Sequence, residues 1–516
     1  MFRRLSSSAV VTLLILVTNV GTSKADLLSS PNPIQYENLS AGTSDWQPSG
    51  PIADDVNNQI KGYTSTPSVM QGQTINFNVS VNPAQGFVLA FYRMGWYQGL
   101  GGRLMGITGL IPGTTQAPCV PDATTGLIDC GWSPSYSLTV PTTWTSGIYL
   151  VKMISQVGYQ DYMIFVVRDG RPAAILYQQP INTYEGYNNY PDDHATGKSL
   201  YDYASFGAPT IAGTTRAVKV SFNRPFNDLG VGDFLFWEVD FVRWIERSGY
   251  DVTYSTDLDT QLNGANLLRS RAFIAVGHSE YWTKEMRDAV ETARDAGVNV
   301  GFFGANTDYR QVRYEAAADG TPNRTVVHYR FPALDPVQGP TTTTETRSAP
   351  VNRPEQSMLG IQYTSYVGWG ANVDYVATNT GNSIYTGTLM LDGNHVPGIV
   401  GYEMDKYESQ YPLPAGSGYA LLSASPFTDV NGTADTSNSS IYQAPSGAWV
   451  FCAGTISWSY GLDSFAGPGA DVRLERLTAN VLDRFTGGMS VAGPMATVNP
   501  LAIKTWLRAP VQIPGD

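Results

Sequence analysis

The chain has 516 residues, of which 42% are hydrophobic and 15% are charged, and its formal net charge at pH 7 is −12. This length suggests about two to four domains with substantial hydrophobic cores. The acidic charge and the lack of Lys/Arg runs argue against a nucleic-acid partner, and the apolar content excludes a disordered chain. The 52 Gly, 30 Tyr and 11 Trp residues favour strands, turns and aromatic surfaces over helix bundles.

Residues 1–25 have the pattern of a secretory signal peptide. Arg3 and Arg4 precede the apolar stretch Ala9–Val17, and Ser23–Ala25 places small residues at positions −3 and −1 of a cleavage site. The apolar stretch is too short to cross a membrane, and no later stretch reaches about 18 apolar residues. We therefore expect a protein without a membrane span that is exported to the periplasm or out of the cell.

Export permits disulfide bonds between the three cysteines. Cys119 and Cys130 flank a segment rich in turn formers, so we expect a bridge that closes a hairpin-like loop. Cys452 lies in the apolar run Ala448–Ala453, where a buried structural thiol is expected. The cysteine spacings do not match those of zinc sites.

Residues 61–170 contain short, evenly spaced segments that alternate apolar and polar side chains. This spacing is typical of an antiparallel β-sandwich of immunoglobulin or fibronectin type. Residues 26–60, which are rich in Pro, Ser and Asn, form a lead-in segment before it. The predicted strands include Thr74–Val81, Gly86–Tyr92, Tyr136–Val140, Gly147–Ser155 and Asp161–Val167.

Residues 171–486 alternate buried strands with amphipathic helices. This order predicts an α/β domain whose mostly parallel sheet is covered by helices on both faces. Residues 320–440 are predicted to form an insertion beside the sheet, and residues 487–516 a Pro-punctuated tail. The predicted strands are Ala173–Tyr177, Tyr250–Ser255, Ala272–Gly277, Val298–Gly304 and Ala448–Gly454; the predicted helices are Trp237–Ser248, a helix capped by Thr283 and stopped at Gly297, and Val472–Phe485.

Polar side chains follow several of these strands, at the edge of the sheet where parallel sheets bind ligands. His278 and Glu280 follow one strand, Asn306 follows the next along the chain, and the Tyr/Asn-rich loop 184–203 follows the first. The chain has only four His, so a His at a strand end is informative. If the strand continues past His278, the side chains of His278 and Glu280 share one face and can meet one ligand. The alternative is that they form only a hydrogen-bonded pair that caps the next helix.

Eight short motifs occur in order between about Pro172 and Phe485. They are Tyr187-Asn188, Ser199-Leu200-Tyr201, Arg224-Pro225-Phe226, Phe241–Asp251, His278–Trp282, Gly304–Thr307, Gly401-Tyr402-Glu403 and Gly454–Trp458. Together they resemble the catalytic domain of the N,N-dimethylformamidase large (beta) subunit family, which is also accompanied by a sandwich. The resemblance implies a glutamine-amidotransferase/flavodoxin-like α/β fold and the hydrolysis of a linear amide.

The resemblance also implies a mononuclear ferric iron held by two tyrosines and one glutamate. By motif, Glu280 is the carboxylate ligand, and Tyr187 and Tyr201 are the phenolate ligands. The loop between the two tyrosines is shorter here than in the family, so other tyrosines remain alternatives. These are Tyr184, Tyr190 and Tyr203. Phenolate and carboxylate are hard anionic oxygens, which suit ferric iron better than thiolates do.

Three further residues carry roles by resemblance. His278 matches the general acid/base of the family, Asn306 an amide that orients the substrate or contacts an oxyanion, and Glu403 a second acidic group. Arg310 departs from the pattern, because many relatives have an aromatic residue there. The wall of the pocket is therefore expected to differ.

Two other functions are open. One is a glycan-directed hydrolase in which Glu280 and Glu403 act as paired carboxylates. The other is a non-catalytic envelope or glycan-binding protein on the same fold. A Ser-His-Asp hydrolase is disfavoured because the chain has no Gly-x-Ser-x-Gly elbow. The leading hypothesis is an exported, iron-dependent hydrolase of a small-molecule, peptide or glycan amide, for which a small formamide is an improbable substrate.

Overall fold

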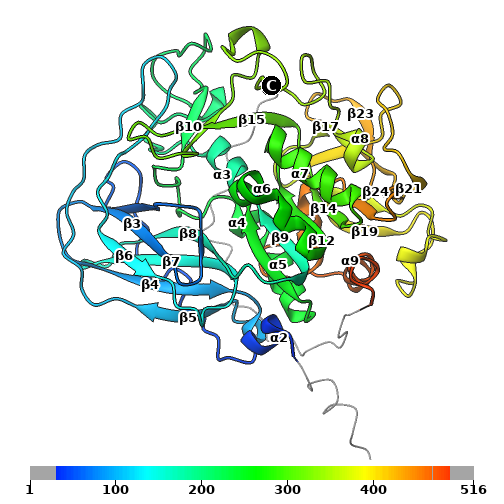
Figure 1. Cartoon of the computed structure of the whole chain (residues 1–516), viewed down its shortest axis with the longest axis horizontal. Helices are drawn as coiled ribbons and strands as arrows, with labels where there is room; N and C mark the ends of the chain where they lie inside the picture. Colours follow the sequence, from blue (N-terminus) through cyan, green and yellow to red (C-terminus); the bar gives the residue numbers. More distant parts are fainter. Residues whose placement is uncertain (1–30, 468, 489–516) are drawn as a thin grey trace, which may run out of the picture.

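The computed structural model describes residues 31–467 and 469–488. The predicted signal peptide and most of the predicted tail lie outside the described residues. Figure 1 shows the N-terminal strands, in blue and cyan, on one side of the molecule and the later elements on the other. Within the described ranges, no helix is both long enough and apolar enough to cross a membrane.

The N-terminal part consists of two facing sheets. One has the strand order β2-β8-β7-β4-β5 and the other β1-β3-β6, and all pairs are antiparallel except β2–β8. Phe77 from one sheet packs against Phe91 and Phe165 from the other, in a single core. The predicted antiparallel strands are therefore present, while the immunoglobulin type stays a prediction. The elements are α2 (Pro33–Glu37), β1 (Ile60–Thr64), β2 (Ser68–Met70), β3 (Thr74–Val81), β4 (Phe87–Met94), β5 (Gly102–Ile107), β6 (Tyr136–Thr139), β7 (Gly147–Ser155) and β8 (Gln160–Arg168).

A seven-stranded sheet forms the centre of the second part, in the order β11-β9-β12-β14-β25-β24-β21. The four pairings among the first five strands are parallel, and the last two pairings, β25–β24 and β24–β21, are antiparallel, which confirms the mostly parallel sheet. The likeness to glutamine amidotransferases or flavodoxin stays a prediction. The strands are β9 (Ala173–Gln179), β11 (Val252–Thr256), β12 (Ser270–His278), β14 (Asn299–Ala305), β21 (Ser417–Leu421), β24 (Ser440–Gln443) and β25 (Trp449–Cys452).

Helices cover both faces of this sheet because successive strand residues point to opposite faces. Ile274 of β12 belongs to the core with α5 (Val239–Arg247) and α9 (Val472–Thr486). Its neighbour Phe273 belongs to the core with α7 (Lys284–Asp295). Helix α6 (Asp257–Asn263) packs against α7.

The predicted helix Trp237–Ser248 is present as α5, which begins two residues later and ends one residue earlier than predicted. The structure has α4 (Phe234–Trp237), then a break at Glu238, then α5. The buried carboxylate of Glu238 accepts hydrogen bonds from the hydroxyls of Tyr177, at 2.7 Å, and Tyr184. These long-range bonds fix the side chain of Glu238, and nothing in the local periodicity reveals them.

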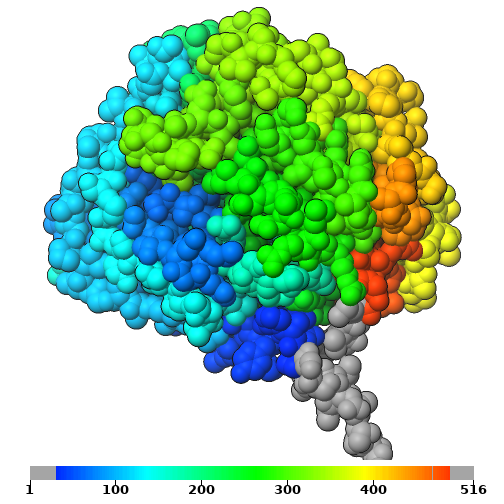
Figure 2. Space-filling view, in the orientation of Figure 1, coloured from blue at the N-terminus to red at the C-terminus, as the bar shows by residue number. Residues whose placement is uncertain are grey.

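Smaller elements surround the sheet. A four-stranded sheet has the order β10-β16-β15-β13, and three two-stranded sheets pair β17 with β20, β18 with β19 and β22 with β23. Figure 2 shows the segment 320–440, in yellow-green to yellow, on the surface of the molecule. The elements are α3 (Ile181–Tyr187), α8 (Gln356–Leu359), β10 (Lys219–Ser221), β13 (Tyr281–Thr283), β15 (Arg310–Glu315), β16 (Thr325–Val327), β17 (Gln362–Tyr366), β18 (Val373–Val376), β19 (His395–Val400), β20 (Glu403–Lys406), β22 (Ser425–Thr428) and β23 (Ala434–Ser437), with short 3₁₀ helices at Tyr97–Gly99, Asp202–Ala204, Gly264–Arg269, Pro332–Leu334, Ser383–Tyr385 and Ile456–Gly461.

The two parts are joined by buried polar contacts. Arg93 of β4 forms an ion pair with Glu246 of α5 at 2.7 Å, and neither side chain is exposed. Lys61 of β1 donates to the carbonyl oxygen of Asp228 at 3.0 Å. Breaking the ion pair would leave two buried charges unpaired, so this contact in particular holds the sandwich against the α/β part.

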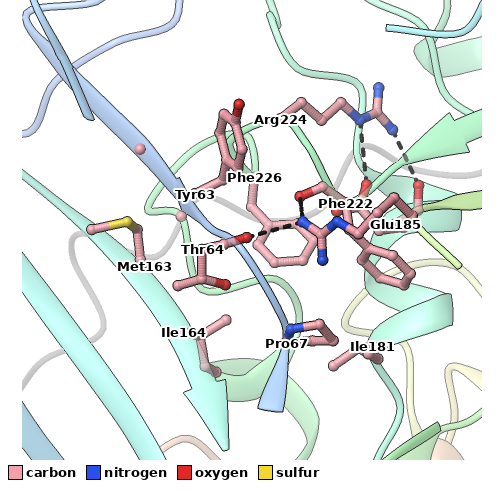
Figure 3. A pocket seen from close by; sticks show the side chains of 13 residues that line it. Tyr63, Thr64, Pro67, Met163, Ile164, Ile181, Glu185, Phe222, Arg224 and Phe226 are labelled. Carbon is pink, nitrogen blue, oxygen red and sulfur yellow. Dashed lines mark hydrogen bonds and ion pairs between the residues drawn. The ribbon is translucent and has the colours of Figure 1, made fainter. Parts of the chain in front are cut away.

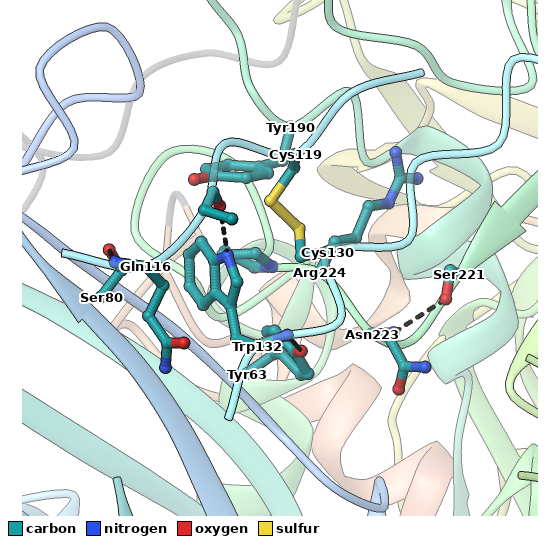
Figure 4. The surroundings of a disulfide bond; sticks show 12 residues. Tyr63, Ser80, Gln116, Cys119, Cys130, Trp132, Tyr190, Ser221, Asn223 and Arg224 are labelled. Atoms are coloured by element: carbon teal, nitrogen blue, oxygen red, sulfur yellow. Dashed lines mark hydrogen bonds between the residues drawn. A yellow bond between two sulfur atoms is a disulfide. The ribbon is translucent and has the colours of Figure 1, made fainter. Parts of the chain in front are cut away.

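A disulfide joins Cys119 and Cys130, whose Cα atoms are 4.6 Å apart. Figure 4 shows the bond beside Tyr190 and Arg224. The backbone N–H of Cys130 donates to the carbonyl oxygen of Asn223 at 2.9 Å, so the closed loop is attached to the α/β part. Cys452 is a buried free thiol, in line with its apolar run.

Candidate functional site

The carboxyl ends of β12 and β14 lie side by side. The two strands pair in parallel, and the last pair of residues is His278 and Ala305, so Asn306 emerges next to His278. Gly304 makes this approach possible, because a Cβ atom there would stand 1.9 Å from the carbonyl oxygen of Gly277. Two polar groups from different strands thus share one edge of the sheet, as the strand pattern predicts.

Glu280 is the centre of a cluster of oxygen atoms. Tyr187, from the end of α3, donates to Glu280 Oε2 at 2.9 Å. Tyr201 Oη lies 2.8 Å from the same oxygen and 2.9 Å from Tyr187 Oη, and the two rings stack with centroids 4.4 Å apart. The three residues proposed as metal ligands are therefore together. Of the alternatives, Tyr184 binds Glu238, and Tyr190 donates to Asn58 Oδ1 at 2.6 Å.

His278 lies between two carboxylates. Its Nε2 atom is 3.4 Å from Glu280 Oε2 and 3.1 Å from Glu403 Oε2. The side-chain amide of Asn306 donates to Glu403 Oε2 at 2.8 Å and lies 3.3 Å from His278 Nε2. His278, Glu280, Asn306 and Glu403 are each at most 3% exposed. All four polar groups singled out by their motifs thus form one buried network.

The charges of this network shift its pKa values. Burial disfavours the charged form of His278, but Glu403 and Glu280 outweigh burial and raise its pKa to about 10. Burial opposes ionisation of Glu280, yet His278 and Arg310 hold its pKa below the usual value. Burial and the charge of Glu280 raise the pKa of Tyr187 and of Tyr201 well above that of a free phenol.

Two arginines bring positive charge to the tyrosine side of the cluster. Arg310 Nε lies 3.3 Å from Glu280 Oε1, and its side chain is buried. The guanidinium of Arg330 lies over the ring of Tyr201, 5.2 Å from the centroid. The departure noted at position 310 thus places a guanidinium directly against the proposed carboxylate ligand.

Sequence reasoning missed two supporting residues. The hydroxyl of Tyr281 donates to Tyr201 Oη at 2.8 Å, so it orients this phenol. Asp405 Oδ1 accepts the backbone N–H of Asn306 at 2.8 Å and holds that residue at a φ of 53°. A signal for Asp405 was available: it follows Glu403 by two residues in the strand β20, so both side chains point to the same face.

The described residues contain no group of three or more His, Cys, Asp or Glu side chains placed to hold a metal ion. The cluster around Glu280 is of another kind, with one carboxylate and two phenols. Its oxygens lie 2.8–2.9 Å apart, which is the spacing of neighbouring ligands around an ion with bonds of about 2.0–2.1 Å. Once the phenols lose their protons, the set fits a hard, oxygen-loving cation.

Comparison with known proteins supports the motif-based prediction. A family described as "N,N-dimethylformamidase beta subunit-like, C-terminal" matches residues 88–472, which is more than half of the chain. The chain belongs to this family. The match begins inside the N-terminal sheets, well before the first motif, so the family extends over most of both parts of the structure.

The individual relatives are distant. The N,N-dimethylformamidase beta subunit of Alcaligenes sp. is 27% identical over an alignment of 217 residues, and the match covers 36% of this chain and 28% of that protein. The chain thus spans about a quarter of that relative's length. Among solved structures, a superoxide reductase (neelaredoxin) from Ignicoccus hospitalis has 12% identity and a TM-score of 0.13 over 21% of this chain and 80% of its own. A cycloisomaltooligosaccharide glucanotransferase from Paenibacillus sp. has 12% identity and a TM-score of 0.15 over 45% of this chain and 28% of its own. These structural likenesses are too weak to carry an argument.

Proposed function

We propose that the protein is an exported amidohydrolase that cleaves a C–N bond with the help of one ferric ion held by Glu280, Tyr187 and Tyr201. The observation that carries the proposal is the convergence of these three oxygen donors, 2.8–2.9 Å apart, with His278 Nε2 3.4 Å from the same carboxylate. Membership in a family named for the N,N-dimethylformamidase beta subunit supports amide hydrolysis as the reaction class. Export rests on the pattern of residues 1–25.

The roles of the protein groups follow from their contacts. Bound iron would supply Lewis acidity, which polarises an amide carbonyl and lowers the pKa of water. His278 Nε2 is the atom that takes and returns a proton, and Glu403, 3.1 Å away, orients the imidazole. The amide of Asn306 fixes Glu403 and presents a neutral donor beside His278. Burial of these groups excludes bulk water and strengthens each interaction.

The glycan-hydrolase hypothesis gains no support from this geometry. His278 Nε2 bridges Glu280 and Glu403, within 3.4 Å of both carboxylates. A pair of glycosidase carboxylates instead needs the space between them for the sugar and its attacking group. The amide-hydrolase proposal is therefore preferred to the glycan-hydrolase hypothesis.

Metal analysis tests the proposal directly. We expect about one iron per chain and a visible tyrosinate-to-iron absorption band. Glu280→Ala should lose both the iron and the band, and Tyr201→Phe should show a weaker band. Tyr190→Phe is the matched control, because this tyrosine lies on the same loop but binds Asn58. A folded protein that binds no iron when refolded or expressed with it, with spectra unchanged in the variants, would refute the proposal.

If iron binds, a screen of small amides and of peptide or glycan amides identifies the substrate class. His278→Gln should retain iron and its absorption band but lose turnover, because the side chain no longer carries a proton between groups. Loss of iron together with turnover would instead assign His278 to the metal site.

A further inference from the structure

A cavity lies at the junction of the sandwich and the α/β part. Its walls come from β1 and β8 on one side, and from α3 and the segment around Phe222 on the other. Figure 3 shows Thr64, Pro67 and Ile164 facing Ile181 and Phe222 across it. The cavity has a volume of about 30 Å³. This is enough for one or two molecules or ions of the size of water, and it is far below the volume of a pocket for a drug-sized ligand.

Arg324 lines this cavity and forms no direct ion pair within the described residues; the carboxylates of Glu185, Asp129 and Asp319 act on it from farther away. The residue is 3% exposed. Its Nε donates to Asn223 Oδ1 at 2.8 Å, and its Nη2 donates to the carbonyl oxygens of Thr64 and Phe222 at 2.9 and 2.7 Å. All three acceptors are neutral. Nη1 is buried and has no acceptor within the described part of the protein.

The other charges of the cavity cancel. Arg224 forms an ion pair with Glu185 at 3.3 Å, and both side chains are at most 1% exposed. The walls therefore carry two guanidinium groups and one carboxylate, which leaves one positive charge. Burial lowers the pKa of Arg324 to about 10, so the group stays charged at neutral pH. A buried charge without a direct ion-pair partner is expensive, and buried charges in proteins are usually paired.

We propose that this cavity binds a small monovalent anion, which accepts hydrogen bonds from Arg324 Nη1. The size of the cavity limits the anion to the dimensions of chloride or formate. Since Nε and Nη2 are already occupied, no edge of the guanidinium is left for the two-pronged binding of a larger carboxylate or phosphate. The anion accepts from Nη1 through one atom, with Phe222, Ile164 and Ile181 as apolar walls.

The site has a structural role. Arg324 bonds to Thr64 in the sandwich and to Phe222 and Asn223 in the α/β part. An anion at Nη1 neutralises the residue that joins the two parts, so its binding stabilises their junction. This inference is independent of the iron and of the proposed reaction.

Thermal denaturation of the full-length protein tests the site. Melting temperatures are measured in chloride, bromide, formate and gluconate at constant ionic strength, gluconate being too large to enter. We expect a saturable rise in melting temperature with the small anions. The preferred ligand is the anion that gives half of this rise at the lowest concentration. Arg324→Met should abolish the rise, and Glu185→Gln should lower the half-saturation concentration because it adds one net positive charge. Arg269→Gln removes an exposed arginine outside this cavity and serves as the control.

A crystal soaked in bromide gives the direct measurement. An anomalous peak within hydrogen-bond distance of Arg324 Nη1 supports the site. Water in the cavity of the bromide-soaked crystal overturns it, and so does an anion effect that Arg324→Met retains. If Arg324→Met does not fold, the bromide crystal and Glu185→Gln decide the question.

Discussion

Arg224 is predicted to hold the two tyrosine-bearing segments together. Its guanidinium donates to the carbonyl oxygens of Asn188, next to Tyr187, at 2.7 Å, and of Lys198, before Tyr201, at 2.8 Å. It also pairs with the buried carboxylate of Glu185. Figure 3 shows Arg224 and Glu185 joined in this way. The substitution Arg224→Met replaces the guanidinium with a shorter, uncharged side chain and so removes all of these bonds.

The size of the effect follows from burial. Glu185 is 1% exposed, and without Arg224 its remaining side-chain partner is the amide of Asn188 at 3.2 Å. A buried ion pair that loses one member costs about 3–5 kcal/mol. The loss of hydrogen bonds from a charged donor to two buried carbonyls adds to this cost. We therefore expect Arg224→Met to lower the free energy of unfolding by at least about 3 kcal/mol.

Urea unfolding of a double-mutant cycle checks the reasoning. Arg224→Met, Glu185→Gln and the double variant are compared with the parent protein by tryptophan fluorescence. The double variant should recover about 1–3 kcal/mol relative to the sum of the single losses, because it leaves no unpaired carboxylate. Arg224→Lys should behave almost like Arg224→Met, since an ammonium cannot reach carbonyls on both segments. The reasoning is wrong if Arg224→Met lowers the free energy of unfolding by less than about 1 kcal/mol, or if the effects of the two single substitutions are additive.

Three further predictions concern stability. Lys61→Met should lower the free energy of unfolding in urea by about 3–5 kcal/mol, because the buried Lys61 ammonium lies 3.0 Å from the buried carboxylate of Asp161. Replacing Asp161 by Asn in the Lys61→Met protein should recover part of this stability. Joint replacement of Cys119 and Cys130 by Ser should cost about 3 kcal/mol, the loop-closure value for a bridge between residues 11 apart in sequence, and an equal loss on adding reductant to the parent protein would support the same cause. Thr283→Ala should lower the free energy of unfolding by about 1 kcal/mol, because the Thr283 hydroxyl accepts the N–H of the third residue of α7 at 3.1 Å. Thr283→Ser should retain most of the stability of the parent protein, and a Thr283→Ala variant as stable as the parent would contradict the capping role.

Local patterns were sufficient to predict much of the fold. The strands Thr74–Val81 and Gly147–Ser155 have the predicted bounds, and α9 differs from its prediction by one residue. His278 and Asn306 were placed correctly at one edge, because the ends of adjacent parallel strands must meet there. These successes rest on alternation and capping, which act over a few residues.

The rest depended on contacts between distant residues, which no periodicity encodes. The buried carboxylate of Glu238, for example, is bound by two tyrosines more than fifty positions earlier. Likewise, the ion pair of Arg310 with Glu280 follows from the pairing of β13 with β15, which sequence did not reveal. The family motifs identified Tyr187 as a candidate site residue, which its spacing alone could not do.

The chain order of the site has a consequence for folding kinetics. Tyr187 meets Glu280 across 93 positions, and Asn306 meets Glu403 across 97 positions and Asp405 across 99. Contacts between distant positions form late, because a long loop must first be closed. The cost of closing a loop grows only with the logarithm of its length, so these contacts carry nearly the same cost. Refolding should therefore show no stage at which the cation ligands are together while His278 still lacks Glu403.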